Sequence, residues 1–459
     1  MSVLDSDGFV DMVATSAKRH KIPGLSAAFI RGDTVRCASS GVLNVSTRVA
    51  VTDDSVFQVG SIAKVFTGTL VMQLVDEGML ELDAPIRRYL PQLRIANEPI
   101  SDAVTVRRLL THTSGIVGDL FLDTGRNDEA TALYVDRCSD LPYLTEPGRY
   151  FSYCNSGFNI LGRAIEVITK QTWAARLHEA LLAPLWIAAL VDAEDAPRYR
   201  TAVGHVLDGS GDVQITPTCF LPRGCEAAGS RLAMSPASLL GFARLHLRDG
   251  VAPNGRRLLS AQAARAMREL EVRLPIDIGE VGGWGLSWQI LDSWKPRTVG
   301  HDGGTVGQTA FLRVIPEWDV AVAALTNISS GGPRMAFDEI VGDVLGAIGE
   351  TNIPHNPAPN GAMTIEAERF VGIYETHLSR FEVEASDGTL RATVSQRNNE
   401  SIGDLPAHHL VLRPIDGDRF IAEDEPYGAA SVVGFTDYGK QGKARFLFSG
   451  LRLAERVRD

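Results

Sequence analysis

A serine and a lysine stand three positions apart in Ser61-Ile62-Ala63-Lys64, where the apolar pattern predicts a helix that runs to about residue 77. A spacing of three places both side chains on one helix face, one turn apart. A serine hydroxyl needs a neighbouring base to become a nucleophile, and a buried lysine supplies one when its pKa falls far below about 10.4. Backbone N–H groups at the helix start favour an oxyanion. The pair predicts serine acyl chemistry, but the pattern recurs by chance and needs support from other motifs.

A second candidate motif is Tyr153-Cys154-Asn155. A phenol held near cations can take the serine proton and pass it to a leaving group. The asparagine amide offers a donor and an acceptor to a substrate amide. The plain alternative is a core tyrosine followed by an asparagine that caps the helix predicted over 156–169. We expect the Cys154 side chain to point into the core, as packing rather than as a nucleophile.

A third candidate is His301-Asp302-Gly303-Gly304, which lies beside a predicted strand. A glycine-rich strand edge lets a substrate backbone approach and pair with it. The N–H of Gly304 would complete an oxyanion hole with that of Ser61. The alternative is a turn that carries a surface histidine.

Together, Ser-x-x-Lys, Tyr-x-Asn and His-x-Gly in this order resemble the motifs of the penicillin-binding protein and serine β-lactamase superfamily. The tyrosine points to the branch of class C β-lactamases, D-aminopeptidases and esterases. His112 belongs to a signature that is structural in this branch, so we leave it outside the predicted site. The resemblance spans about 9–348 and includes the segments 57–60, 109–115 and 146–148.

The resemblance implies a two-step acyl transfer. Ser61 would attack a carbonyl, with Lys64 and Tyr153 sharing the role of base and the choice between them left open. Tyr153, tuned by His301, would protonate the leaving group. Water or an amine would then resolve the acyl-enzyme. The substrate-binding residues that follow from the motifs are Asn155, Gly303 and Gly304.

The superfamily implies an α/β (α+β) β-lactamase/transpeptidase-like fold, with an antiparallel sheet flanked by helices and a helical subdomain at about 80–280. The sequence pattern agrees, since it predicts early strands at 25–30 and 34–38 and returning strands at 285–291, 308–314 and 320–325. Helices are predicted at 8–20, 104–111, 128–140, 156–169, 172–185, 236–247, 261–270 and 335–348.

The catalytic domain is predicted over 1–350, followed by a Pro- and Asn-rich linker at 351–362. Short strand-like runs between turn signals then predict a small antiparallel barrel over 363–459, which is lipocalin-like by resemblance. We expect this barrel to pack over the mouth of the active site. Arg452 would then reach in and hold a substrate carboxylate, although a surface arginine in a last strand is the interpretation that the sequence alone favours.

The chain has 459 residues with a net charge of −11, which argues against nucleic acid or an anionic membrane as the main partner. The first residues lack a basic and apolar leader, so we expect a cytoplasmic protein. Five cysteines without Cys-x-x-Cys spacing favour reduced thiols. No His-Glu-x-x-His motif occurs, and we expect neither a metal nor a cofactor.

The third-motif histidine departs from the Lys-x-Gly of β-lactamases and puts β-lactam hydrolysis in doubt. Segments 118–126 and 151–155 are similar to stand-alone penicillin-binding-protein-type thioesterases, which release non-ribosomal peptides from carrier proteins by cyclisation. We therefore expect an acyltransferase or hydrolase for peptides with D-residues, in its sharpest version a cyclising thioesterase that meets a peptidyl thioester and a carrier protein. The alternatives are a D-aminopeptidase or amidase, a short-acyl esterase, a class C-like β-lactamase and a non-catalytic peptide binder. The oligomeric state is left open.

Overall fold

An eight-stranded antiparallel sheet lies at the centre of the catalytic region, with the strand order β10-β11-β12-β13-β14-β15-β1-β2. The computed structural model describes residues 4–349, 351–354, 356–397, 407–424 and 430–458. The strands of this sheet are β1 (Gly24–Arg31), β2 (Thr34–Gly41), β10 (Val272–Arg273), β11 (Gly283–Trp284), β12 (Gln289–Leu291), β13 (Thr298–Thr305), β14 (Gln308–Ile315) and β15 (Val320–Thr326).

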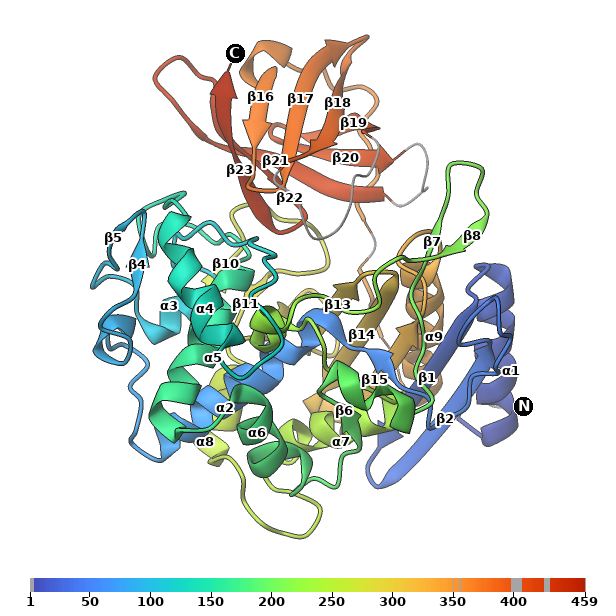
Figure 1. The fold of residues 1–459 in the computed structure, drawn as a ribbon. Coiled ribbons are helices and arrows are strands. Elements are labelled where there is room, and N and C mark those ends of the chain that lie inside the picture. The colour runs from blue at the N-terminus through green and yellow to red at the C-terminus, as the bar shows by residue number, and fades with distance from the viewer. Residues whose placement is uncertain (1–3, 350, 355, 398–406, 425–429, 459) are drawn as a thin grey trace.

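The two faces of the sheet are covered by different helices (Figure 1). Alternate residues of β1 enter different cores, because side chains along a strand point to opposite faces: Ala27 and Phe29 pack with α1 and α9, while Ala28 and Ile30 pack with α2 and α7. The helices are α1 (Ser6–Arg19), α2 (Ala63–Asp76), α3 (Val106–Leu110), α4 (Ala130–Arg137), α5 (Asn155–Thr169), α6 (Trp173–Leu177), α7 (Pro236–Leu247), α8 (Ala261–Met267) and α9 (Pro333–Ile348).

Short strands pair outside the main sheet. They are β3 (Phe57–Gln58), β6 (Ala189–Leu190) and β9 (Ala233–Met234) in one sheet, β4 (Arg94–Ile95) with β5 (Glu98–Pro99), and β7 (His205–Leu207) with β8 (Val213–Ile215). Within the described ranges, no helix has the length and apolar character that crossing a bilayer requires.

The strand predicted over 285–291 is wrong as a single element. The chain instead turns back between β11 and β12, which pair antiparallel with Trp284 opposite Gln289. Ser287 adopts a φ of 79°, a left-handed conformation that reverses the chain. The alternating apolar residues of this stretch conceal the turn, since periodicity does not report a single left-handed residue.

The C-terminal strands close into an eight-stranded antiparallel barrel, which confirms the predicted barrel. They are β16 (Gly372–Glu375), β17 (Ser379–Ser386), β18 (Thr389–Gln396), β19 (His408–Asp416), β20 (Arg419–Asp424), β21 (Ala430–Tyr438), β22 (Ala444–Ser449) and β23 (Arg452–Arg458). The sequence pattern missed β16, which has only four residues. Its pairing with both β17 and β23 is what closes the barrel.

The barrel sits against the catalytic region (Figure 1), and the contact between them is apolar. Phe446 and Phe448 of β22 share a buried cluster with Phe151 and Trp284. Beside this cluster, the Tyr153 backbone N–H donates to the Leu451 carbonyl at 2.8 Å. The turn between β22 and β23 is thereby fixed beside the second sequence motif.

Candidate active site

Ser61 lies in a 3₁₀ turn (Gly60–Ile62) that leads directly into α2. Three glycines let neighbouring backbones approach this turn: a Cβ on Gly60 would lie 2.7 Å from the Gly304 nitrogen, and one on Gly229 would lie 2.1 Å from the Gly60 oxygen. A Cβ on Gly303 would lie 2.0 Å from the Val59 oxygen. The Ser61 turn is therefore held against β13 by contacts that only glycines allow.

Lys64 is fully buried beneath the serine. Its Nζ donates to Ser61 Oγ at 3.0 Å and to the Ala228 carbonyl at 2.6 Å. Burial, helped by the positive charge of Arg452, lowers the pKa of Lys64 to about 7. A substantial fraction of this amine is therefore neutral at neutral pH and has a lone pair available for the serine proton.

Tyr153 lies across the same cavity, with its ring stacked on His112 at 4.2 Å between centroids and its centroid 5.0 Å from Lys64 Nζ. Burial raises the pKa of Tyr153 above its usual range. A contact with the Ser61 hydroxyl offsets part of that shift, but its geometry falls short of a hydrogen bond, and the tyrosine hydroxyl has no hydrogen-bond partner in the described ranges. The serine and the amine thus touch as predicted, whereas the phenol shares their cavity as a protonated group without a bond to either.

His301 lies on β13 and is buried. Its Nδ1 lies 2.7 Å from the Asp302 carbonyl oxygen, which accepts the Nδ1 proton and leaves Nε2 as an acceptor. Burial and the charge of Lys64 lower the pKa of His301 to about 3, so the ring is neutral at neutral pH. Nε2 is buried and has no partner among the residues that the structure describes, and the ring centroid lies 6.2 Å from that of Tyr153.

Arg452 reaches the site, so the surface interpretation that the sequence favoured is wrong. It pairs with Asp119, from Nη2 to Oδ1 at 3.0 Å, and its guanidinium carbon lies 5.0 Å from the Tyr153 ring centroid. Asn155 Nδ2 donates to the same Asp119 oxygen at 2.6 Å. Asn155 does not cap α5, because Cys154 does so with a sulfur that accepts the Gly157 N–H.

A cavity of about 340 Å³ brings these groups together. Lys64 contacts Ser61 from below, and Gly303 packs behind the Ser61 turn. Sequence reasoning missed Asp119, Gln289 and Ser230, and it left out His112, which supports the Tyr153 ring. The cavity is lined by Ser61, Phe121, Tyr153, Asn155, Leu221, Cys225, Ala228, Gly229, Ser230, Gln289, His301, Asp302, Gly304, Leu451 and Arg452.

A family model described as Beta-lactamase matches residues 9–345. The chain belongs to the beta-lactamase family. Penicillin-binding protein 4 of Amycolatopsis lactamdurans is 41% identical to this family member over 362 residues, which are 78% of the chain and 94% of the relative. The resemblance predicted from the motifs is thereby confirmed, and the chain is a serine hydrolase of the β-lactamase and penicillin-binding protein superfamily.

Solved structures extend the similarity of this beta-lactamase family member to both parts of the chain. The crystal structure of SurE has a TM-score of 0.77 at 26% identity and covers 98% of this chain and 99% of its own. The octameric penicillin-binding protein homologue from Pyrococcus abyssi has a TM-score of 0.64 at 24% identity and covers 98% and 100%. The second likeness shows the shared fold, which includes the C-terminal barrel.

We expect acylation of this beta-lactamase family enzyme to follow the titration of Lys64. Because only the neutral amine accepts a proton, kcat/KM for a p-nitrophenyl ester should rise about tenfold per pH unit below 7 and level off above it. His301, with a pKa of about 3, adds no step between pH 5 and 9. Rates measured over this range at constant ionic strength test the expectation.

Arg452→Gln is the control for this pH profile. Arg452 lowers the pKa of Lys64 and Asp119 raises it, so removing the guanidinium should move the midpoint to higher pH. A midpoint near 10 in the unmodified enzyme, or one that shifts downward in the variant, contradicts the assignment.

Proposed function

We propose that the chain is a serine acyltransferase that releases peptides from thioesters and closes them into rings, with a D-residue at the acyl end. The observation that carries the proposal is the similarity to SurE across nearly the whole of both chains. A second structure of SurE contains D-Leu, and this chain matches it at 26% identity with a TM-score of 0.76. The barrel turn that delivers Leu451 and Arg452 to the cavity supports a peptide-sized substrate.

In the first step, Ser61 Oγ attacks the thioester carbonyl and Lys64 Nζ takes its proton. The neutral fraction of Lys64 and the protonated state of Tyr153 favour this division of roles, in which Tyr153 donates its proton to the leaving thiolate and recovers one from Lys64. The N–H groups of Ser61 and Gly304 hold the oxyanion. A thiol leaves, and the acyl group remains on Ser61 as an ester.

In the second step, the amino terminus of the same peptide attacks the ester carbonyl. The new C–N bond forms as the C–Oγ bond breaks, and the amine proton returns to Ser61 Oγ through Lys64. Residues 301–305 of β13 pair with β14, while β12 reaches only as far as Gly300, so one edge of this stretch is available to the substrate backbone. Asn155 and Arg452 contact the peptide from the opposite wall.

The test uses two octapeptidyl thioesters of a short thiol that differ only in C-terminal D-Leu or L-Leu. We expect cyclic product from the D-substrate at least tenfold faster than any product from the L-substrate, with an acyl adduct on Ser61 visible by mass spectrometry. Equal turnover of both, or release of linear peptide alone, contradicts cyclising D-selective transfer.

Three parallel substrates separate the other functions of this fold. Turnover of D-leucine amide but not the thioesters would indicate an amidase, and turnover of short acyl esters without chiral preference would indicate an esterase. Steady hydrolysis of a chromogenic β-lactam would indicate a β-lactamase. The absence of any Ser61 adduct would indicate a peptide binder.

A further inference from the structure

A second cavity of about 370 Å³ adjoins the active site. It shares Gln289, Asp302 and Leu451 with the first cavity, so the two meet at these side chains. Its walls come from the catalytic sheet, from α9 and from the barrel, which contributes Val432 and Phe448. A group bound here would therefore extend directly from the reacting centre.

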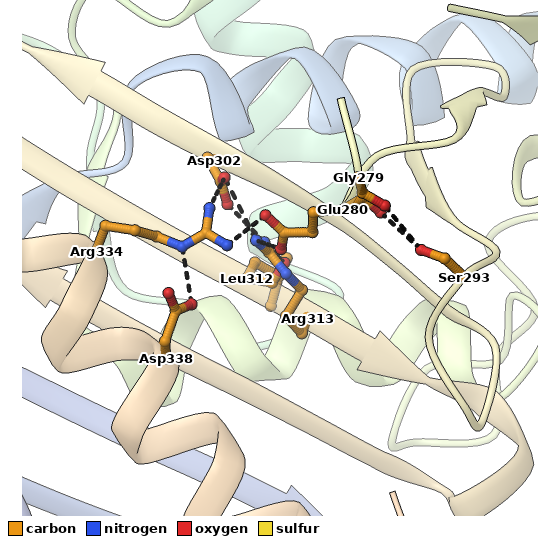
Figure 2. A network of polar contacts seen from close by, with 8 residues as sticks. All are labelled: Gly279, Glu280, Ser293, Asp302, Leu312, Arg313, Arg334 and Asp338. Carbon is orange, nitrogen blue, oxygen red and sulfur yellow. Dashed lines mark hydrogen bonds and ion pairs between the residues drawn. The ribbon is translucent and has the colours of Figure 1, made fainter. Parts of the chain in front are cut away.

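Five charged side chains form a network on the catalytic side of this cavity (Figure 2). Arg313 is fully buried and donates to Asp302 at 2.5 Å and to Glu280 at 2.8 Å. Arg334 donates to Asp338 at 2.8 Å and pairs with Glu280, and its remaining nitrogen lies 3.7 Å from Asp302. Three carboxylates against two guanidiniums leave one negative charge.

Arg313 is fully buried. Arg334, although its side chain is 41% exposed and lines the cavity, pairs with Glu280 and Asp338. Asp302 and Asp338 also keep exposed carboxylate surface. The side chain of Asp302 is 29% exposed and that of Asp338 is 41% exposed, and both line the cavity. A carboxylate has about four acceptor sites, and each of these two uses only some of them. The wall can therefore accept hydrogen bonds from a cationic ligand.

Gln289 gives independent evidence for a ligand. Its side chain is only 4% exposed, and its Oε1 has no hydrogen-bond partner among the described residues. A buried, unsatisfied amide oxygen costs about 1–3 kcal/mol, so such an atom calls for an explanation. Because Gln289 lines both cavities, a donor on a ligand that passes between them would satisfy it.

We propose that the second cavity binds a basic group of the peptide substrate, a primary ammonium or a guanidinium, while Gln289 accepts an N–H from the segment that leads to it. This inference rests on the proposed function, because its kinetic test requires that an acyl-enzyme form on Ser61. The ligand class follows from the walls, which combine an unpaired acceptor with a net negative charge. The basic group binds here without reacting, and the attacking amine stays at Ser61.

The experiment measures breakdown of the Ser61 acyl-enzyme formed from a D-aminoacyl p-nitrophenyl ester. Lysinamide and norleucinamide are added as acceptors, since they have side chains of similar length and only lysine has an ammonium. We expect lysinamide to accelerate the breakdown at least tenfold more than norleucinamide at equal concentration. Asp338→Asn should reduce this ratio to about two or less.

Glu339→Gln is the matched control on the same helix. Glu339 bonds His20 and Arg19 on the α1 side, so the variant should keep the wild-type ratio. No preference in the wild type, or a preference that survives Asp338→Asn, overturns the inference. If no acyl-enzyme forms, the proposed function fails. Calorimetric titration of the unacylated enzyme with the two amides then tests the cavity assignment by itself. Lysinamide binding at least fivefold tighter than norleucinamide supports the assignment, and equal binding overturns it.

Discussion

Ser61→Ala is expected to abolish acyl-enzyme formation and to lower kcat/KM for any acyl donor by at least about 10⁴-fold. The serine oxygen is the atom to which the acyl group would attach, and it lies 3.0 Å from the amine that would activate it. Alanine keeps the backbone N–H that we assign to the oxyanion. The residual rate therefore measures what the oxyanion site and Tyr153 contribute without a nucleophile.

The measurement combines steady-state rates with intact-protein mass after exposure to a fluorophosphonate. Ser230→Ala is the control, because Ser230 lines the same cavity with a buried hydroxyl that has no partner in the described part of the chain. That variant should still be labelled. Labelling that persists in Ser61→Ala, at Ser230 or elsewhere, contradicts Ser61 as the nucleophile.

Tyr153→Phe is expected to lower kcat by about 10²–10⁴-fold, the usual contribution of a positioned proton donor. It should do so without lowering the melting temperature. The ring stays stacked on His112, and the hydroxyl that is lost is buried without a partner among the residues described. Removing an unsatisfied polar group costs no full hydrogen bond, so the free energy of unfolding should stay the same or rise slightly.

Tyr134→Phe shows the opposite behaviour and serves as the control. The Tyr134 hydroxyl donates to the Leu120 carbonyl at 2.9 Å and lies 3.0 Å from Ser156 Oγ. Its loss should lower the unfolding free energy by about 1–2 kcal/mol and leave turnover within a few fold. Stability from chemical denaturation and kcat on one ester are compared for both variants. A Tyr153→Phe enzyme that is less stable but fully active would mean that this tyrosine is structural.

That the three segments meet is predicted by the resemblance of their motifs, taken together and in order, to those of the superfamily; each motif alone is ambiguous. The spacing did not predict that the Tyr153 hydroxyl stays unbonded, which depends on how far the His112 and Trp284 rings hold the phenol from the serine. It also did not predict the approach of Arg452. That contact depends on the placement of a whole barrel, which is set by the apolar cluster around Phe446 and by the Tyr153–Leu451 hydrogen bond.

The sequence did not indicate Gln289 as a site residue for a related reason. Within a stretch that reads as one continuous strand, it is an ordinary polar residue, and only the reversal at Ser287 turns it toward the reacting centre. Asp119 lies within the segment 118–126, which is similar to thioesterases. Its pairing with a residue on β23 nevertheless required tertiary information.

The turn that carries Leu451 has a consequence for synthesis on the ribosome. Ser61, Lys64 and Tyr153 all leave the exit tunnel long before the residues that form the far wall of their cavity. Until β23 pairs with β16 and β22, the nascent chain holds its nucleophile in an open depression that lacks Arg452. Completion of the catalytic centre is thus coupled to closure of the barrel, and a release-arrested chain ending before residue 450 would react with a fluorophosphonate more slowly than the 459-residue chain.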